Sequence, residues 1–237
     1  MIEDLRALLA QGNIVLTDEA QERLLAYHRL LLEWNARMDL TNVPEEEMAL
    51  RHYADSLLPL ARKEWFPDGA RLIDVGTGAG FLDMPLLILR PDLQMTFLDA
   101  LSKRIGFLED ALKRLNLAAT ALHARAEDAA RLDMHREAYD AAVSRAVASS
   151  ATLQELTLPF VKTGGLAIAW KGPGVQEELV AAKRAAFVLG GTVRGISPAP
   201  VPGREDWAHC LLIIDKTGRT PKAYPRKAGT PGRKPLA

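Results

Sequence analysis

The feature that most constrains this chain is a glycine-rich bend directly after a short apolar run. The run is residues 72–75, and the bend contains Gly76, Gly78 and Gly80. Such a run is typical of a strand buried on both faces of a sheet. A second apolar run, Met84–Leu89, is expected to be a helix, so this stretch predicts the first half of a β-α-β unit. Glycine lets the chain turn sharply and lets a ligand approach the main chain, and the helix start behind it offers free N–H groups.

The spacing of the glycines narrows the choice of ligand. The dinucleotide fingerprint G-x-G-x-x-G needs a glycine where Phe81 stands, which disfavours a nicotinamide dehydrogenase. A phosphate-binding P-loop is excluded because no Gly-Lys-Ser/Thr follows the bend. The G-x-G-x-G spacing that is present is the form used by nucleoside-binding methyltransferases.

An acidic residue downstream supports a nucleoside ligand. Residues 94–99 are predicted to form the next strand, which ends at Asp99, 19 positions after Gly80. A carboxylate at this place can accept two hydrogen bonds from a ribose diol. The bend alone would fit a purely structural turn equally well, but the bend together with Asp99 predicts a nucleoside cofactor.

Composition and charge set the broad class. The 237 residues are 48% hydrophobic and 25% charged, which is ordinary for a globular protein. No apolar run reaches the ~18 residues of a membrane span, so no membrane association is expected. Cys210 is the single cysteine, which favours a cytoplasmic location. The net charge is zero, but residues 216–237 hold seven basic residues and no acid, which suggests a contact with a polyanion.

We expect the chain to be divided into three parts. Residues 1–69 are predicted to form a helical extension, in which Thr17 is the N-cap of a helix. Residues 70–216 alternate strands and helices and are predicted to form a sheet of about seven strands with helices on both faces. In this part Gly164 and Gly165 are expected to turn the chain into a strand over residues 166–171. Residues 217–237 form a basic tail rich in proline and glycine, in which no regular element is expected.

Polar residues follow several strands at the edge where open α/β sheets bind ligands. Arg145 ends one predicted strand, and we weigh a ligand contact equally with an ion pair to Glu127, Asp128 or Asp99. Glu127 follows another strand, where it could instead cap a helix. Lys171, before Gly-Pro, is either a cation held in place by the loop or a solvated lysine.

The extension also contains polar side chains, namely His28, His52 and Asp55. For these the favoured interpretation is structural: they cap or satisfy backbone groups and pack two helices. The sequence shows neither a metal-binding cluster nor a G-x-S-x-G elbow. Catalysis would therefore depend on positioning, which is enough when the acceptor has a free lone pair. Arg145 and Lys171 are the candidates for a catalytic role.

Nine segments together resemble one family over nearly the whole chain. They are residues 34–35, 40–41, 52 with 55–57, 72–81, 98–100 with 103–104, 125–128, 144–148, 171–173 and 224–231. This pattern is similar to the bacterial small-subunit rRNA guanine-N7 methyltransferases, also called glucose-inhibited division protein B. The last segment is the most specific, because a generic methyltransferase has no reason to contain Tyr-Pro-Arg-Lys-Ala-Gly-Thr-Pro.

The resemblance implies a class I (Rossmann-like) methyltransferase fold, S-adenosylmethionine as donor, and N7 of guanine 527 in 16S rRNA as acceptor. The partner would be the free RNA or the assembling small subunit, and the protein would act as a monomer. The implied cofactor-binding residues are Gly76, Gly78, Phe81, Asp99, Ala100, Leu101, Ala126, Glu127 and Arg145. We expect Asp99 to hold the ribose, Ala126 and Glu127 to meet the adenine, and Gly76 and Phe81 to lie along the amino-acid end. Arg145 would face the cofactor carboxylate or the RNA.

The chain departs from the family pattern directly after the bend. The family continues with Pro-Gly where this chain has Leu82 and Asp83. The proline would preset φ at the helix start, and Asp83 adds a Cβ and is expected to place a negative charge near the donor site. We therefore expect weaker cofactor binding than in relatives.

The basic tail provides the candidate RNA contacts. With Lys171, they are Arg219, Lys222, Tyr224, Arg226 and Lys227. Basic side chains neutralise phosphates, and an aromatic ring can stack on an unpaired base. A solvated, disordered tail is the simpler alternative. Two other functions remain open at this point: a methyltransferase of the same fold that acts on a small molecule or protein, and a non-catalytic RNA-binding module.

Overall fold

A seven-stranded sheet organises the computed structural model, which describes residues 2–145 and 148–236. Its strands are β1 (Arg71–Val75), β2 (Gln94–Asp99), β3 (Thr120–His123), β4 (Tyr139–Arg145), β5 (Val161–Lys171), β6 (Gly191–Pro198) and β7 (Cys210–Lys216). Their order is β3-β2-β1-β4-β5-β7-β6. β1 to β5 are parallel, whereas β7 is antiparallel to both β5 and β6. Ala146 and Val147 of the 144–148 segment lie outside the described residues.

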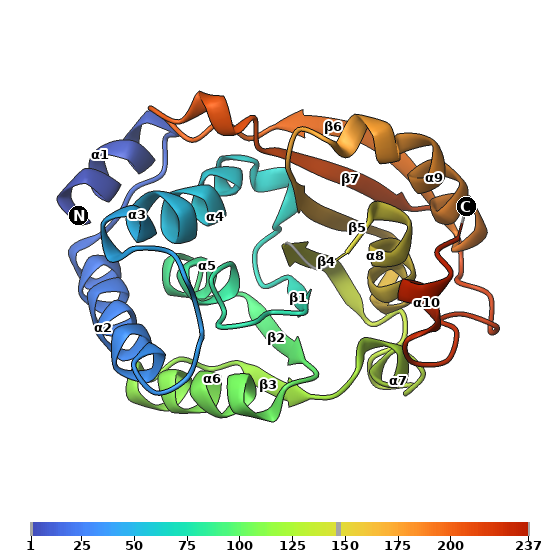
Figure 1. The fold of residues 1–237 in the computed structure, drawn as a ribbon, viewed down its shortest axis with the longest axis horizontal. Helices are drawn as coiled ribbons and strands as arrows, with labels where there is room; N and C mark the ends of the chain where they lie inside the picture. Colours follow the sequence, from blue (N-terminus) through green and yellow to red (C-terminus); the bar gives the residue numbers. More distant parts are fainter. Residues whose placement is uncertain (1, 146–147, 237) are drawn as a thin grey trace.

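Helices cover both faces of the sheet, as the sequence predicted (Figure 1). One face carries α1 (Ile2–Gln11), α2 (Asp18–Asn35), α5 (Asp83–Leu89), α6 (Ser102–Arg114) and the segment of α3 (Glu45–Met48), a π-helical turn (Ala49–Ala54) and α4 (Asp55–Leu57). The other face carries α7 (Ala126–Ala129), α8 (Ser150–Thr157) and α9 (Val175–Val188). The strands alternate between the two cores: Leu72 packs on the first face, and Ile73 packs on the second. This period of two is what a sheet covered on both sides requires.

The N-terminal helices begin where their sequence indicated. The Thr17 side chain accepts a hydrogen bond from the Ala20 N–H (3.2 Å), which confirms it as the N-cap of α2. Tyr27 of the same helix is fully buried and donates its hydroxyl to the Ala79 carbonyl (2.7 Å). The helices before β1 therefore support the glycine bend directly, because one of their side chains bonds its backbone.

The expected turn at Gly164 and Gly165 is wrong, since β5 runs through both residues. The pairing of β4 with β5 is irregular here, because Tyr139 pairs with Val161 and Ala141 with Leu166, and both glycines lie in this irregular part of β5. A Cβ on Gly165 would stand 2.4 Å from the Asp140 carbonyl oxygen. Glycine is needed there because the neighbouring backbone leaves no space for a side chain.

The tail also differs from the expectation. It contains α10 (Thr230–Arg233), with Pro231 in its first turn, where a proline costs no hydrogen bond. α10 lies beside α8 (Figure 1), and the Thr152 hydroxyl of α8 donates to the Pro231 carbonyl (3.1 Å). The tail is therefore packed against the second face of the sheet.

Candidate functional site

The glycine bend joins β1 to α5 in a conformation that favours glycine. Gly76, Gly78 and Gly80 have φ of 78°, 61° and 74°. Gly76 N–H and Thr77 N–H both donate to the Leu98 carbonyl (2.8 and 3.1 Å), which ties the bend to β2. A Cβ on Gly80 would lie 2.7 Å from Leu108, whereas one on Gly78 would meet nothing within 4 Å. Residue 80 thus has to be a glycine because a side chain there would clash with its neighbours. Gly78 faces open space, where a ligand can approach.

Asp99 points toward this bend, as the nucleoside hypothesis requires. Its Oδ2 accepts the Gly78 N–H (3.0 Å), and its Oδ1 accepts the Leu101 N–H (2.8 Å). The Arg104 guanidinium also reaches Oδ2, at 3.3 Å. Arg104 is more than one-third exposed, so its head is free to move, while the carboxylate itself is buried.

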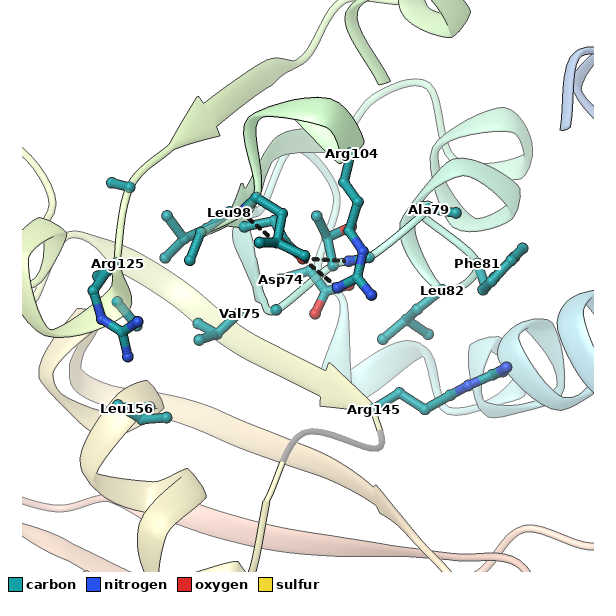
Figure 2. A pocket seen from close by; sticks show the side chains of 18 of the residues that line it. Asp74, Val75, Ala79, Phe81, Leu82, Leu98, Arg104, Arg125, Arg145 and Leu156 are labelled. Carbon is teal, nitrogen blue, oxygen red and sulfur yellow. Dashed lines mark hydrogen bonds and ion pairs between the residues drawn. The ribbon is translucent and has the colours of Figure 1, made fainter. Parts of the chain in front are cut away.

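A cavity of about 510 Å³ opens over the bend and the ends of β1, β2 and β4 (Figure 2). Its lining includes all nine residues expected at a cofactor: Gly76, Gly78, Phe81, Asp99, Ala100, Leu101, Ala126, Glu127 and Arg145. Figure 2 shows Phe81, Leu82 and Arg145 on one side of the cavity, and Arg125 and Leu156 on the other. The volume lies within the range of small-molecule sites.

The residues of this cavity fit S-adenosylmethionine. The Asp99 carboxylate supplies acceptors for a diol, and the open side of Gly78 leaves space beside it. Leu98, Leu101 and Ala126 supply apolar contacts for a base. The lining thus combines a few polar groups with mainly apolar walls, which is the usual composition of a cofactor site.

Arg145 does not form the ion pair that the sequence suggested. Its Nη1 donates to Asp55 Oδ2 (3.1 Å), and its Nη2 donates to His52 Nδ1 (3.2 Å), so Glu127, Asp128 and Asp99 are not its partners. The reason is the N-terminal extension, which places α4 against the end of β4. Arg145 remains on the cavity wall, so its charge faces both this network and the ligand space.

His52 and Asp55 contact more than the two helices of the extension, because they also bond Arg145 at the end of β4. The His52 ring stacks on Phe81 with centroids 3.7 Å apart and planes at 4°. Burial, and after it the neighbouring Arg145 charge, lowers the pKa of His52 to about 3, so the ring is neutral at pH 7. Asp55 also accepts from His209 Nδ1 (2.8 Å). His28 fits the structural interpretation, because it is buried and its Nδ1 bonds the Tyr53 hydroxyl (2.8 Å).

Glu127 connects the cavity to the tail. It lies in the first turn of α7, and its Oε1 accepts the Gly229 N–H (2.7 Å) and the Arg125 guanidinium (3.3 Å). Its carboxylate therefore bonds Gly229 and Arg125 and does not cap its own helix. No sequence signal placed Gly229 at this site.

The basic residues of the tail separate into distinct groups. Arg226 forms a bidentate pair with Glu155, whose side chain is fully buried, so the Arg226 charge is already neutralised. Tyr224 is partly buried in the second core. Arg219 and Lys222 are exposed beside Thr220, whose N–H bonds Glu137 ahead of β4. Lys227 is exposed between the Glu155 and Glu127 contacts, near the cavity.

Lys171 is held in place and is not a solvated lysine. Its Nζ donates to the Ala148 carbonyl (3.2 Å) and pairs with Glu178 Oε2 (2.8 Å). The side chain is mostly buried, and Glu178 balances its charge. In the described part of the chain, no cluster of three or more His, Cys, Asp or Glu side chains is arranged for a metal ion, and no helix is long and apolar enough to cross a membrane.

Asp83 does not place a negative charge on the cavity wall. Its side chain is fully buried below the bend, where its Oδ2 accepts the Thr77 hydroxyl (2.7 Å). Burial, followed by the nearby Asp74 charge, raises the pKa of Asp83 well above its ordinary value. Burial also raises the pKa of Asp74 to about 6. Two buried carboxyls side by side hold a proton at neutral pH, because neither is solvated and their charges repel.

This pair predicts a pH-dependent stability. The folded state binds more protons than the unfolded state above pH 4, so the free energy of unfolding falls as pH rises through 6 and beyond. Asp83→Asn removes one of the two groups, so its free energy of unfolding should fall less steeply between pH 5 and 8. The difference in slope is up to about 1.4 kcal/mol per pH unit for one proton. Urea denaturation at each pH measures this slope. Asp39→Asn, at an exposed position, is the matched control. Identical slopes for wild type and Asp83→Asn would show that Asp83 titrates normally.

Solved structures share this fold. M. jannaschii TYW2, solved in complex with AdoMet, is 13% identical, with a TM-score of 0.51 over 68% of this chain and 74% of that one. TrmN from Thermus thermophilus is 17% identical, with a TM-score of 0.52 over 75% of this chain and 55% of that one. These likenesses are of fold: each is to a solved structure that shares the arrangement of sheet and helices described above.

Sequence relatives show the family to which the chain belongs. The model of rRNA small subunit methyltransferase G (GidB) matches residues 20–199. The ribosomal RNA small subunit methyltransferase G of Alkaliphilus oremlandii (strain OhILAs) is 45% identical over 96% of this chain and 95% of that one. The protein of the same name from Lactobacillus helveticus (strain DPC 4571) is 42% identical over 96% of each chain. The chain belongs to the rRNA small subunit methyltransferase G family and is an S-adenosylmethionine-dependent rRNA methyltransferase.

Proposed function

We propose that the chain transfers the methyl group of S-adenosylmethionine to N7 of one guanine, position 527, in 16S rRNA. The observation that carries the proposal is the cavity over the glycine bend, with the Asp99 carboxylate bonded to Gly78 at its centre. Family membership supports small-subunit rRNA as the substrate. The free lone pair of guanine N7 supports that atom as the acceptor, because methyl transfer to it removes no proton and needs no general base.

The binding roles follow from the positions of the residues. Asp99 accepts the ribose hydroxyls, and Ala100, Leu101, Ala126 and Glu127 border the base. Gly76, Gly78 and Phe81 lie along the amino-acid end, where Arg145 faces the carboxylate or the RNA. This assignment keeps the apolar part of the cavity for the base and the Arg145 side for the carboxylate of the amino-acid end.

Catalysis on this scheme needs positioning and little else. S-adenosylmethionine, when bound, would supply an electrophilic methyl group on a sulfonium. The N7 lone pair would form the new bond to the methyl carbon as the bond from carbon to sulfur breaks, and S-adenosylhomocysteine would leave. His52 is neutral at pH 7 and accepts from Arg145 through Nδ1, so the network fixes the guanidinium without placing a second positive charge beside it. Alignment and the exclusion of water contribute up to about 7–11 kcal/mol in favourable cases.

The test is methyl incorporation from labelled cofactor into separate samples of small subunits, free small-subunit RNA, and an unrelated RNA. Mapping of the modified base should find 7-methylguanine at one position, in the small-subunit samples alone. Label in protein or small molecules, or in none of the RNAs, would contradict the proposal. The comparison of subunits with free RNA also decides which form is the substrate.

The tail predicts an RNA contact near the cavity. Lys227 is exposed beside the Glu127 and Glu155 contacts, whereas Arg219 and Lys222 are near Glu137, ahead of β4. We expect Lys227→Glu to weaken RNA binding and to reduce the slope of log K against log salt by about one. Lys222→Glu is the matched control. The sequence placed Lys222 among the RNA contacts, but its neighbour Thr220 bonds Glu137 ahead of β4, away from the cavity at the carboxyl ends of the strands, so we now expect neither quantity to change. Filter binding at several salt concentrations measures both, and equal effects of the two variants would contradict this placement.

A further inference from the structure

A second cavity, of about 320 Å³, adjoins the first. Its walls include His52, Asp55, Arg145, Trp170, Lys171 and His209. These side chains come from the extension and from the ends of β4, β5 and β7, so four separate parts of the chain build it. Nothing in the cofactor assignment uses it.

The two cavities meet at two shared elements. Arg145 lines both of them. Phe81 lines the first, His52 lines the second, and their rings are stacked. A group transferred from a ligand in the first cavity to a ligand in the second would therefore pass beside Phe81 and Arg145.

Asp55 supplies the second cavity with hydrogen-bond acceptors. Its side chain is 4% exposed, with Oδ1 bonded to His209 and Oδ2 bonded to Arg145. A carboxylate has about four acceptor positions, so two remain for donors of a ligand. Arg145 is a donor with five N–H groups, three of which reach Asp55, Ser56 and His52. The cavity thus offers acceptors and donors side by side.

This combination matches one nucleobase edge. Guanine presents the N1–H and the 2-amino group as adjacent donors, with O6 as an acceptor next to them. Adenine presents an acceptor at N1 where guanine has a donor, and uracil presents a single donor. If N7 receives the methyl group, it has to stay unbonded, so the base has to be read from its Watson–Crick edge, as is common for unpaired RNA bases.

The rim of the cavity suits RNA as well. Arg51 lies on the cavity wall and places its guanidinium 4.5 Å from the centre of the Trp207 ring. Arg204 stacks on the same ring at 4.2 Å. The two guanidinium groups held at this ring offer positive charge for the phosphates that flank an extruded base.

We propose that the second cavity binds the extruded acceptor guanine, with Asp55 accepting its N1–H and 2-amino group and Arg145 donating to O6. N7 then lies at the junction with the first cavity. This proposal deepens the proposed function and rests on it. Asp55 becomes the residue that selects guanine among the bases.

The experiment compares methylation of small-subunit RNA that carries either guanosine or inosine at the target position. Inosine keeps N7, O6 and N1–H and lacks the 2-amino group alone. For the wild type we expect kcat/KM to fall about 10- to 100-fold with inosine, since one hydrogen bond to a charged group is lost. For Asp55→Asn we expect low activity on both RNAs and a ratio within about threefold of one. Titration with S-adenosylhomocysteine and thermal melting confirm that the variant is folded and binds cofactor.

The possible results of this comparison lead to different conclusions. A wild-type ratio near one overturns the guanine pocket, while methylation of guanosine RNA leaves the proposed function intact. A wild-type ratio of ten that persists in Asp55→Asn also overturns it, because another group would then read the 2-amino position. If the wild type methylates no guanine at all, the proposed function fails and the pocket fails with it. Should Asp55→Asn not fold, the wild-type ratio alone decides.

Discussion

Asp99→Ala should lower the affinity for S-adenosylmethionine by at least about 100-fold. Its carboxylate is expected to accept two hydrogen bonds from the ribose diol, and a hydrogen bond to a charged group contributes about 1.5–3 kcal/mol. Asp99 also orders the bend, because Oδ2 accepts the Gly78 N–H and Oδ1 accepts the Leu101 N–H. Loss of both functions makes this the largest effect expected of a single substitution in the site. Calorimetric titration with S-adenosylhomocysteine measures it.

Arg104→Met is the matched control for that titration. Arg104 contacts the same carboxylate but is more than one-third exposed, so its ion pair contributes little. We expect its affinity to stay within about threefold of the wild type. Asp99→Asn keeps the shape of the side chain and one acceptor, so its affinity should lie between those of Asp99→Ala and Arg104→Met. An Asp99→Ala protein that is folded and binds within threefold of the wild type would remove Asp99 from the ribose site.

Arg226→Met should lower the free energy of unfolding by about 3 kcal/mol. Arg226 donates through Nε and Nη2 to both oxygens of Glu155, at 2.6–3.1 Å, and Glu155 is 0% exposed. Without the guanidinium, a buried carboxylate keeps only the backbone N–H of residue 226 (2.7 Å) as its partner in the tail. Removing one member of a buried pair is costly because the remaining charge is poorly solvated.

Two further variants test this cause. Glu155→Gln combined with Arg226→Met should recover part of the loss, because the orphaned charge is then gone. Lys227→Met, at the exposed neighbouring position, should stay within about 0.5 kcal/mol of the wild type. Urea denaturation at pH 7 compares all three. A loss below 0.5 kcal/mol for Arg226→Met would indicate that the tail is not bound to α8 in solution.

The cavity-lining positions expected from the sequence lie at the ends of neighbouring strands. The bend and Asp99 belong to neighbouring strands, and the apolar runs on either side of them identify β1, α5 and β2. Parallel strands bring their carboxyl ends to one edge, so residues that follow strands meet there. This rule places the bend, Asp99, Ala126, Glu127 and Arg145 together, whereas Ala100 and Leu101 were expected from the family resemblance.

The contacts that the sequence did not predict join distant positions. Arg145 and Asp55 are 90 residues apart, and Gly229 and Glu127 are 102 apart. Hydrophobic periodicity predicts that an element forms and which face it buries, but it does not predict which polar side chains two elements bring together. Charge at a strand end indicated that Arg145 needed a partner, but nothing in the pattern favoured Asp55 over the three closer carboxylates. The tail shows the same limit, because its polar composition does not indicate that it bonds to the buried residue Glu155.

A crystal structure with bound S-adenosylhomocysteine tests most directly whether a nucleoside is held between Asp99 and the glycine bend. We expect the ribose hydroxyls within hydrogen-bond distance of the Asp99 carboxylate, with the adenine beside Ala100, Leu101 and Ala126. The sulfur should face Arg145 and Phe81, at the junction with the second cavity. A ligand bound elsewhere, or one whose ribose turns away from Asp99 while the Arg104 pair stays closed, would contradict the account.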